Sequence, residues 1–213
     1  MENKLKRWIM GCFIGIGISF VMNRVGGPWP LTFNLFWLLP ISLIAGAFQS
    51  RWYCLAYSVP ILYGVYNISS YLGLPSKWFI VPYRQLILLV GLLHMAEGIM
   101  AYWEAPKAIV PVKGYKGKEK VEGYQTYLSW LVPLFLFSYK LLFIPMFMVY
   151  SDDTTSLKPV KKFKFMGGCI FLYGACMTCL GWILVKKNLR LEVALLFMPL
   201  LHEILTLIHY KIE

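Results

Sequence analysis

The sequence has few charged residues. Only 15% of its 213 residues are Asp, Glu, Lys or Arg, against about 25% in an average soluble domain. No polar stretch between its apolar runs is long enough to form a separate soluble domain. We therefore expect a single integral membrane domain that covers residues 1–213.

The sequence also lacks an intact catalytic motif. The zinc-protease pattern H-E-x-x-H begins at His202 and Glu203, but Thr206 occupies the place of its second histidine. The five cysteines lie in or beside apolar runs, where a free thiol behaves as a small hydrophobe. Cys176 and Cys179 form a C-x-x-C pair without the setting of a redox domain. An enzyme is therefore the less favoured interpretation, and no cofactor is expected, with a divalent metal as the weaker alternative.

Apolar runs fill most of the chain. Hydrophobic residues make up 59% of it and the mean hydropathy is +0.61. No small-x-small cleavage site follows the first run, so we interpret it as a retained span rather than a signal peptide. Runs of about 20 residues predict transmembrane helices. The predicted fold class is an all-α polytopic transmembrane helical bundle of about seven spans, at 8–22, 31–48, 52–72, 85–103, 127–150, 165–185 and 191–210.

Two of these runs carry further signals. In the first, Gly11, Gly15 and Gly17 could let another helix approach closely, or could reflect the ordinary frequency of glycine in membrane helices. The fifth, from Tyr127 to Tyr150, contains two prolines and a central Lys140. It predicts one broken span, or two half-helices that raise the count to eight if the run splits at Lys140.

The sizeable polar region lies at 104–125. Apolar and lysine-containing segments flank a turn rich in Gly and Lys. A small β-hairpin at the membrane surface and an ordinary solvated loop are equally compatible with this pattern.

The formal net charge is +11. The Lys and Arg residues form short clusters between apolar runs, a pattern that favours contact with anionic lipid head groups over nucleic acid. With seven spans and the N-terminus inside, more of them fall on the inner side than on the outer side. This interpretation places the chain in the plasma membrane as a multi-pass protein.

Several ionisable residues lie deep within the predicted spans. The predicted intramembrane polar cluster consists of His94, Glu97, Lys140, His202, Glu203 and His209. His94 and Glu97 are separated by about one helical turn and therefore share a face. Three interpretations remain open: a metal site formed by His94, Glu97, His202 and Glu203, a transport or proton-relay path, and structural hydrogen bonds between helices. The third is the most favoured of these.

A set of short motifs resembles the membrane half of the MinJ-type, PDZ-domain-containing membrane proteins of Gram-positive bacteria. The motifs are H-x-x-E-G at 94–98, then Tyr102, Pro111, Gly117, Val121, Gly123 and Tyr124, W-x-V-P-L at 130–134, and finally His202 and Glu203. The resemblance implies a bacterial protein whose helices precede a cytoplasmic PDZ domain and link a polar scaffold to a division inhibitor. This sequence stops at Glu213, where that domain would begin. A cytoplasmic C-terminus would also require eight spans.

The function predicted on these grounds is that of a non-enzymatic membrane scaffold or assembly protein linked to cell division or envelope organisation. A protein partner or a second copy of the chain is expected. The alternative is a transporter or a metal-dependent intramembrane enzyme that uses the His/Glu pairs. The alternative predicts that His94, Glu97, His202 and Glu203 converge around a polar cavity.

Overall fold

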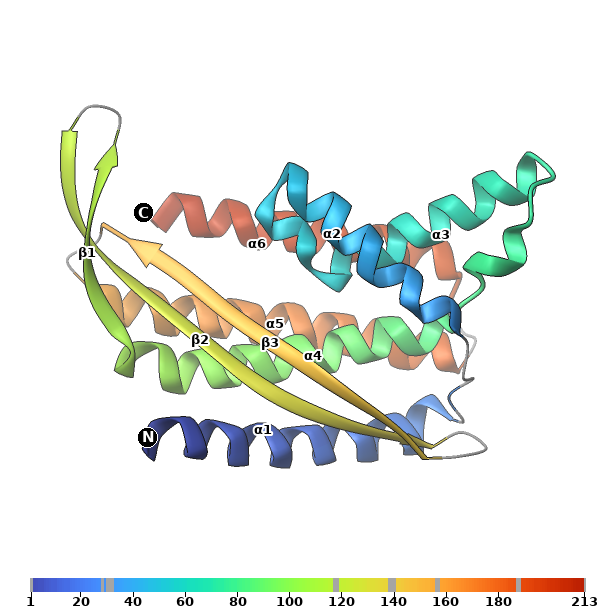
Figure 1. Ribbon diagram of the computed structural model, residues 1–213, viewed down its shortest axis with the longest axis horizontal. Helices are drawn as coiled ribbons and strands as arrows, with labels where there is room; N and C mark the ends of the chain where they lie inside the picture. Colours follow the sequence, from blue (N-terminus) through green and yellow to red (C-terminus); the bar gives the residue numbers. More distant parts are fainter. Residues whose placement is uncertain are drawn as a thin grey trace.

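A computed structural model describes residues 2–27, 29, 33–116, 119–137, 141–155, 158–186 and 189–212. Six α-helices and a three-stranded antiparallel sheet make up its main elements, and both termini lie at one end of the molecule (Figure 1). The order along the chain is α1 (Glu2–Val21), η1 (Met22–Gly26), η2 (Phe33–Trp37), α2 (Leu38–Phe48), η3 (Ser50–Tyr53), α3 (Leu55–Tyr71), η4 (Ser76–Phe79), α4 (Tyr83–Glu104), η5 (Ala105–Lys107), β1 (Ile109–Lys116), β2 (Glu119–Phe137), β3 (Leu141–Thr154), α5 (Pro159–Val185) and α6 (Leu191–Ile212).

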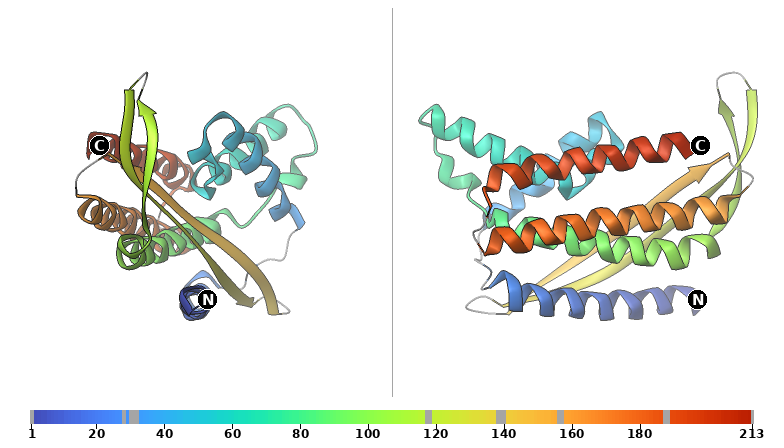
Figure 2. Two further views of the ribbon diagram at one scale, coloured as in Figure 1. Left: turned by 60° about the vertical axis from the view of Figure 1, so that its left-hand side comes forward. Right: turned by 180° about the vertical axis from the view of Figure 1, so that it is seen from behind.

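The prediction of an all-α bundle with about seven spans is wrong. Within the described residues, four helical segments are long and apolar enough to cross a membrane: Leu5–Gly26, Ser76–Lys107, Pro159–Val185 and Leu191–Ile212. These helices indicate a membrane protein. They lie side by side, and the sheet crosses them diagonally (Figure 2).

The run from Tyr127 to Tyr150 is neither one span nor two half-helices, because it forms most of β2 and β3. Lys140, at which the split was predicted, lies outside the described residues. β2 and β3 pair from Tyr124 opposite Thr154 to Phe137 opposite Leu141. Such a long hairpin satisfies its inner backbone groups without a helix, which is the requirement that an apolar environment imposes.

Both prolines of this run suit a strand pair. Pro133 lies directly opposite Pro145. In an antiparallel pair, alternate residues direct their N–H groups away from the partner strand. Phe135 and Phe137 donate theirs toward α1 rather than β3, so Pro133 has the same orientation and its missing N–H removes no bond to β3. By the pairing, Pro145 also faces away from β2.

One face of α1 covers the free edge of β2. It consists of Gly11, Gly15 and Ser19, and Asn23 of η1 continues it at the same spacing of four residues. The Phe135 N–H donates to Ser19 Oγ at 2.8 Å, and Asn23 both donates to the Phe135 carbonyl at 2.9 Å and accepts from the Phe137 N–H at 2.8 Å. A Cβ added at Gly11 or Gly15 would collide with a β2 carbonyl oxygen, whereas Gly17 has nothing within 4 Å. Because Gly11 and Gly15 have no side chain, the backbone of β2 can pack directly against α1.

A seam of glycines joins α4 and α5. Its members recur every seven residues: Gly91 and Gly98 on α4, and Gly167, Gly174 and Gly181 on α5. A Cβ at any of them would meet atoms of the facing helix, mostly of its backbone, at less than ordinary contact distance. The two helices are antiparallel neighbours, and this close packing positions the buried face of α4.

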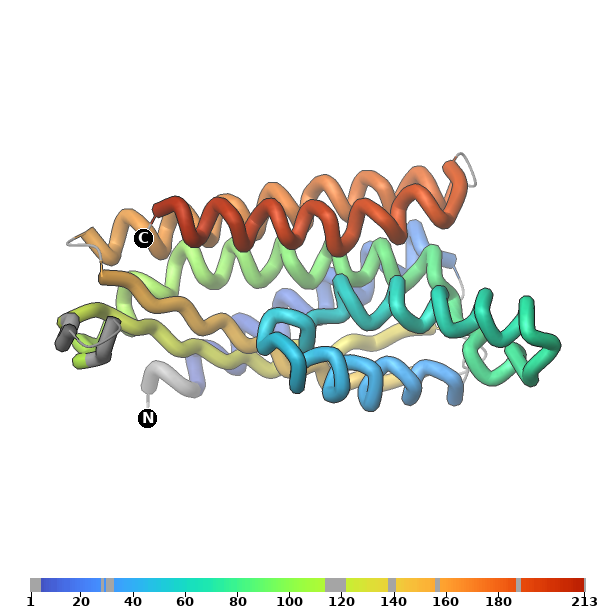
Figure 3. The backbone as a smooth tube through the Cα atoms, turned by 90° about the horizontal axis from the view of Figure 1, so that it is seen from above, coloured from blue at the N-terminus to red at the C-terminus, as the bar shows by residue number. Residues whose placement is uncertain are grey.

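The second and third predicted spans form a helical hairpin instead. α2 has 11 residues and α3 has 17, too few to cross about 30 Å of hydrocarbon with 1.5 Å of rise per residue. α2 enters from the end opposite the termini, and α3 returns toward that end (Figures 1 and 3). The tip of this hairpin, η3, therefore lies beside the middle of α6.

The polar region at 104–125 contains the end of α4, η5, β1 and the first part of β2. β1 pairs with β2 from Ile109 opposite Thr126 to Lys116 opposite Glu119. Beyond that segment, even-numbered β2 side chains up to Leu136 are buried, and odd-numbered β3 side chains are exposed. The long hairpin therefore presents one face to the helices and an apolar face outward, with Phe143, Phe147 and Val149 exposed.

Candidate functional site

A partly open cavity of about 930 Å³ lies among α4, α5, α6, β3 and the tip of the α2–α3 hairpin. Its lining includes most of the polar side chains that the sequence places within apolar runs. Cys54, His94, Glu97, Asp152, His202 and His209 all border it.

His94 lies in the wall of this cavity on α4. Its side chain is buried, and its Nδ1 lies 2.8 Å from the carbonyl oxygen of Val90, one turn earlier. Because a carbonyl oxygen can only accept, Nδ1 carries the hydrogen and Nε2 has the lone pair. That Nε2 lies 3.3 Å from Cys54 Sγ.

Cys54 reaches His94 from the hairpin tip. η3 ends at Tyr53, and Cys54 has an extended backbone (ψ 141°) and is the N-cap of α3. Its sulfur accepts from the Ala56 N–H at 3.4 Å. Cys54 therefore contacts both the first turn of α3 and the His94 ring.

His202 faces His94 from α6. Their ring centroids are 5.9 Å apart, and the Tyr173 ring contacts both edge-on, at 4.8 Å from His94 and 5.5 Å from His202. The Tyr57 hydroxyl lies 3.0 Å from His202 Nδ1 and donates to Glu203 Oε1 at 2.9 Å. Since that hydroxyl has one hydrogen, His202 Nδ1–H donates to it, and His202 Nε2 has the lone pair.

Cys54, His94 and His202 thus form a compact cluster of metal-ligating groups. The sulfur and one nitrogen of each ring all lie within 4.8 Å of one another. Both imidazoles are held through Nδ1, which is the outer-shell arrangement of metal-binding histidines.

Glu97 follows His94 by one turn, and its half-buried side chain lines the same cavity. Among the described residues, none makes a hydrogen bond or ion pair with Glu97. Its carboxylate is therefore available to the cavity, as a fourth ligand or as a base.

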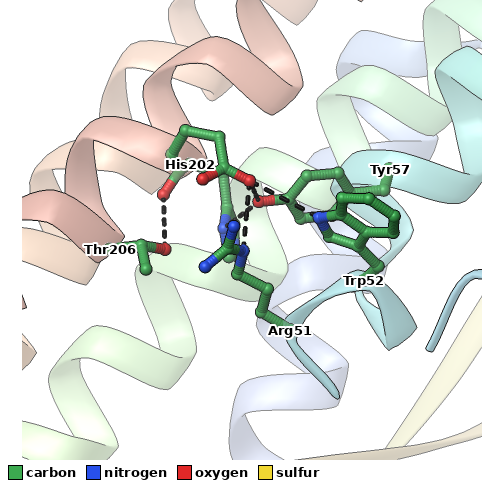
Figure 4. A network of polar contacts seen from close by, with 6 residues as sticks. Arg51, Trp52, Tyr57, His202 and Thr206 are labelled. Atoms are coloured by element: carbon green, nitrogen blue, oxygen red, sulfur yellow. Dashed lines mark hydrogen bonds and ion pairs between the residues drawn. The ribbon is translucent and has the colours of Figure 1, made fainter. Parts of the chain in front are cut away.

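Glu203 contacts the hairpin tip, where Arg51, Trp52 and Tyr57 lie beside His202 (Figure 4). Its Oε1 lies 3.2 Å from Arg51 Nε and accepts from Trp52 Nε1 at 3.5 Å and from Tyr57. The predicted metal ligand Glu203 therefore neutralises Arg51 and positions His202 through Tyr57.

His209 belongs to a second cluster at another part of the cavity. Its Nδ1 lies 3.4 Å from Asp152 Oδ1, which also pairs with Lys162 Nζ at 3.2 Å. Lys162 further donates to the Asp153 carbonyl, and Tyr150 donates to Asp152 Oδ2 at 2.8 Å. Since the lysine ammonium already occupies the carboxylate, this cluster is an ion-pair network rather than a cation site.

The structure therefore brings His94, Glu97 and His202 together, places Glu203 behind them, and separates His209. Sequence reasoning missed Cys54 as a member of the site. Forty positions separate it from His94, and the one local signal is its place after the short polar break Gln49–Arg51 at the start of an apolar run. That signal predicts the start of a helix but not which side chains the helix start will meet.

Comparisons with known proteins identify no relative. No protein-family model, no curated protein and no solved structure matches the chain. The geometry of the site is therefore the basis for its function.

Proposed function

We propose that the chain is an integral membrane metallohydrolase whose metal ion is bound by Cys54, His94 and His202. The observation that carries this proposal is the convergence of one sulfur and two imidazoles within 4.8 Å in the wall of a cavity. It favours the metal-dependent alternative over purely structural hydrogen bonds, because tight packing without a cavity would be enough for the latter.

The donor set matches Zn²⁺ best. Zinc takes Cys sulfur and His nitrogen in tetrahedral sites, and bonds of about 2.0–2.3 Å separate neighbouring ligand atoms by roughly 3.3–3.8 Å. The Cys54–His94 distance of 3.3 Å already lies in that range. His202 needs a side-chain adjustment of about 1 Å at most to complete the set.

Three protein ligands leave a fourth position for water, which is the arrangement of catalytic zinc sites. A zinc ion bound there would lower the pKa of that water and polarise a substrate carbonyl. Glu97, on the same face of α4 as His94, is placed to accept the proton from the water and to pass it to the leaving group.

A second candidate rests on the contact between Cys54 and His94 alone. A thiol within reach of an imidazole whose other nitrogen is fixed is also the arrangement of a cysteine nucleophile and its base. In this mechanism His94 Nε2 takes the proton of Cys54 and the sulfur attacks a carbonyl carbon. The bond to the leaving group then breaks as His94 returns the proton to that group, and water hydrolyses the thioester to release the acid and free Cys54. This mechanism gives no role to His202.

Metal analysis of the detergent-purified protein separates the two candidates. We expect about one zinc ion per chain in the wild type, and loss of the metal in Cys54→Ala, His94→Ala and His202→Ala. Cys169→Ala, a half-buried cysteine on α5, is the matched control and keeps the metal. A wild-type protein without metal, whose activity is abolished by alkylation of Cys54, would establish the second candidate instead.

The orientation that we propose places both termini in the cytoplasm of a plasma-membrane, multi-pass protein. The terminal end of the molecule contains the larger set of described basic residues: Lys6, Arg7, Lys107, Lys113, Lys158, Lys161, Lys162, Lys164 and Lys211. The other end contains Arg24, Lys77, Arg84, Lys186 and Arg190. This excess follows the positive-inside rule and suits anionic lipid head groups. The predicted seven-span layout put Lys158 and Lys161 on the side opposite the N-terminus, whereas they lie at the same end of the molecule as the N-terminus.

A fusion of alkaline phosphatase to the C-terminus tests this orientation. The fused enzyme should stay inactive, and an active fusion would show that the C-terminus lies outside the cytoplasm.

The scaffold role linked to cell division or envelope organisation, and the MinJ-type resemblance behind it, stay predictions. They require a stable protein partner or self-association in mild detergent. Cross-linking in native membranes followed by purification tests them independently of the metal, since a monomeric protein without any cross-linked neighbour would contradict both.

A further inference from the structure

The outer edge of β3 has a row of backbone groups to which no described residue is paired. Even-numbered residues of β3 bond to β2, because the odd-numbered β2 residues direct their N–H and C=O groups toward α1. The odd-numbered residues of β3 therefore direct theirs outward. In the part of the chain that the structure describes, no backbone group pairs with this edge between Phe143 and Ser151.

This edge borders the candidate site. Seven consecutive residues, 146–152, line the 930 Å³ cavity. Because successive side chains of a strand point to opposite faces, a cavity that meets all of them must lie along the edge of the strand. The groups on that edge therefore face the same space as Cys54, His94 and Glu97.

A second cavity extends the first one along β3, and the two together form a groove. The second cavity has a volume of about 730 Å³ and borders residues 142–146 of β3, so Met146 lines both cavities, as does Leu55. Its remaining lining, from Trp29, η2, α2, α3 and α4, is apolar except for Ser42. Eleven consecutive residues of β3 thus follow one groove that is apolar at one end and contains the metal-ligating cluster at the other.

The two long edges of the β2–β3 hairpin have different surroundings. α1 and η1 cover that of β2 with glycines, Ser19 and Asn23, so its polar groups are paired or closely packed. The edge of β3 has a groove beside it instead. An unpaired backbone group in an apolar setting costs several kilocalories per mole, and an extended peptide is the ligand that satisfies alternating donors and acceptors at strand spacing.

We propose that this groove binds an extended, apolar peptide segment as a fourth strand, paired with the outer edge of β3. The segment is the substrate of the proposed metallohydrolase, and the inference rests on that function for its chemical outcome. The apolar cavity takes the apolar side chains, and the strand pairing carries the peptide bond past Cys54, His94 and His202. A lipid acyl chain would fill the apolar cavity but leave the β3 edge unpaired.

Val149 provides a direct test. Its N–H lies on the outer edge, so Val149→Pro removes one donor to the peptide without removing a bond to β2. Val149→Ala removes the same exposed side chain and keeps the donor. The probe is a fluorescent twelve-residue peptide of Leu, Val and Ser, titrated in detergent micelles and measured by anisotropy.

We expect Val149→Pro to weaken peptide binding about three- to tenfold, as the loss of one hydrogen bond does, and Val149→Ala to bind as the wild type. Equal affinity for all three proteins would overturn the inference. So would equal losses in both variants, because the side chain rather than the edge would then be responsible.

A second experiment leaves the protein unchanged. Two versions of the peptide are N-methylated at alternate amides, one at odd and one at even positions. Only one set of amides can face β3, so one version should lose binding and the other should keep it. Equal binding of both to the wild type would show an occupant that needs no strand pairing, such as an acyl chain.

Metal content is recorded for every sample, which separates the two proposals. Peptide binding that depends on the edge in a protein without metal would contradict the metallohydrolase and leave the groove intact. A metal-containing protein that is indifferent to the edge would contradict the groove alone. Glu97→Gln should bind both metal and peptide but fail to cleave a quenched version of the probe.

Discussion

Lys162 Nζ lies 3.2 Å from Asp152 Oδ1, and the two residues are only 3% and 5% exposed. The pair joins α5 to β3 at the border of the cavity, and His209 of α6 and the Tyr150 hydroxyl complete it. The strand whose outer edge borders the cavity is thus fixed to two helices by one carboxylate.

We predict that Lys162→Met destabilises the protein by about 3–5 kcal/mol, because it leaves the buried Asp152 without its counter-charge. Lys161→Met is the control, since that neighbouring side chain is exposed, and it should have little effect. Unfolding by SDS titration from mild detergent measures both. If the double variant Asp152→Asn, Lys162→Met is as unstable as the two single losses added together, the residues are not coupled and the prediction is wrong.

Gly15 should be intolerant of even one methyl group. Its Cβ would collide with the carbonyl oxygen of Pro133, a backbone atom that cannot rotate away. We expect Gly15→Ala to cost about 1–3 kcal/mol, the usual cost of overpacking. Gly17→Ala, two residues on and open on all sides, should be neutral or slightly stabilising in the same assay. A loss of stability in both variants would mean that helix α1 itself, rather than its fit to β2, is sensitive.

Gly174, in the seam between α4 and α5, should also be intolerant of a methyl group. A Cβ there would meet the Met95 nitrogen and the Gly91 oxygen, so Gly174→Ala must push the helices apart. We predict a loss of about 1–3 kcal/mol and, because α4 positions His94, weaker zinc binding as well. Gly168→Ala on the same helix has free space and should gain up to about 1 kcal/mol from helix propensity. Unchanged metal affinity in Gly174→Ala would separate the seam from the site.

Tyr57→Phe tests the outer shell of the metal centre. It removes the hydroxyl that accepts from His202 Nδ1 and donates to Glu203. Loss of such a partner typically lowers metal affinity by about 10- to 100-fold. We expect that decrease in a competition titration with a zinc chelator, and no change for Tyr53→Phe, whose side chain is half exposed. Equal affinities in the wild type and Tyr57→Phe would exclude His202 as a ligand held in this way.

The sequence was informative where apolar runs were long and uninterrupted. Four of the seven predicted spans correspond to helices of spanning length. The run from Tyr127 to Tyr150 could not be assigned by periodicity, because a strand that is apolar on both faces gives the same continuous run as a buried helix. Its two prolines fit a broken helix equally well. Only the pairing of Pro133 with Pro145 shows that they occupy positions where no ladder bond is lost.

The site could be predicted in part, for a related reason. His94 and Glu97 share one turn, so local spacing was enough to place them on one face. The prediction that polar residues of α4 and α6 converge is supported for His94 and His202, whose ring centroids are 5.9 Å apart. Cys54 could not be found, because its position depends on where a helical hairpin turns. A hairpin tip is fixed by tertiary contacts such as Arg51 with Glu203, which no window of sequence contains.

The face of α1 that covers the β2 edge has a consequence for how molecules of this protein can associate. A sheet with two open edges can add copies at both and grow without limit, as in a fibre. Along 127–137, α1 closes one of the two. Along this part of the hairpin, two copies that join through their β3 edges therefore form a closed pair, because the opposite edge is already covered. Gly11 and Gly15 let α1 cover the β2 edge, and they thereby limit association along 127–137 to one partner per molecule. Once the β3 edge is occupied, this part of the hairpin has no open edge for another copy.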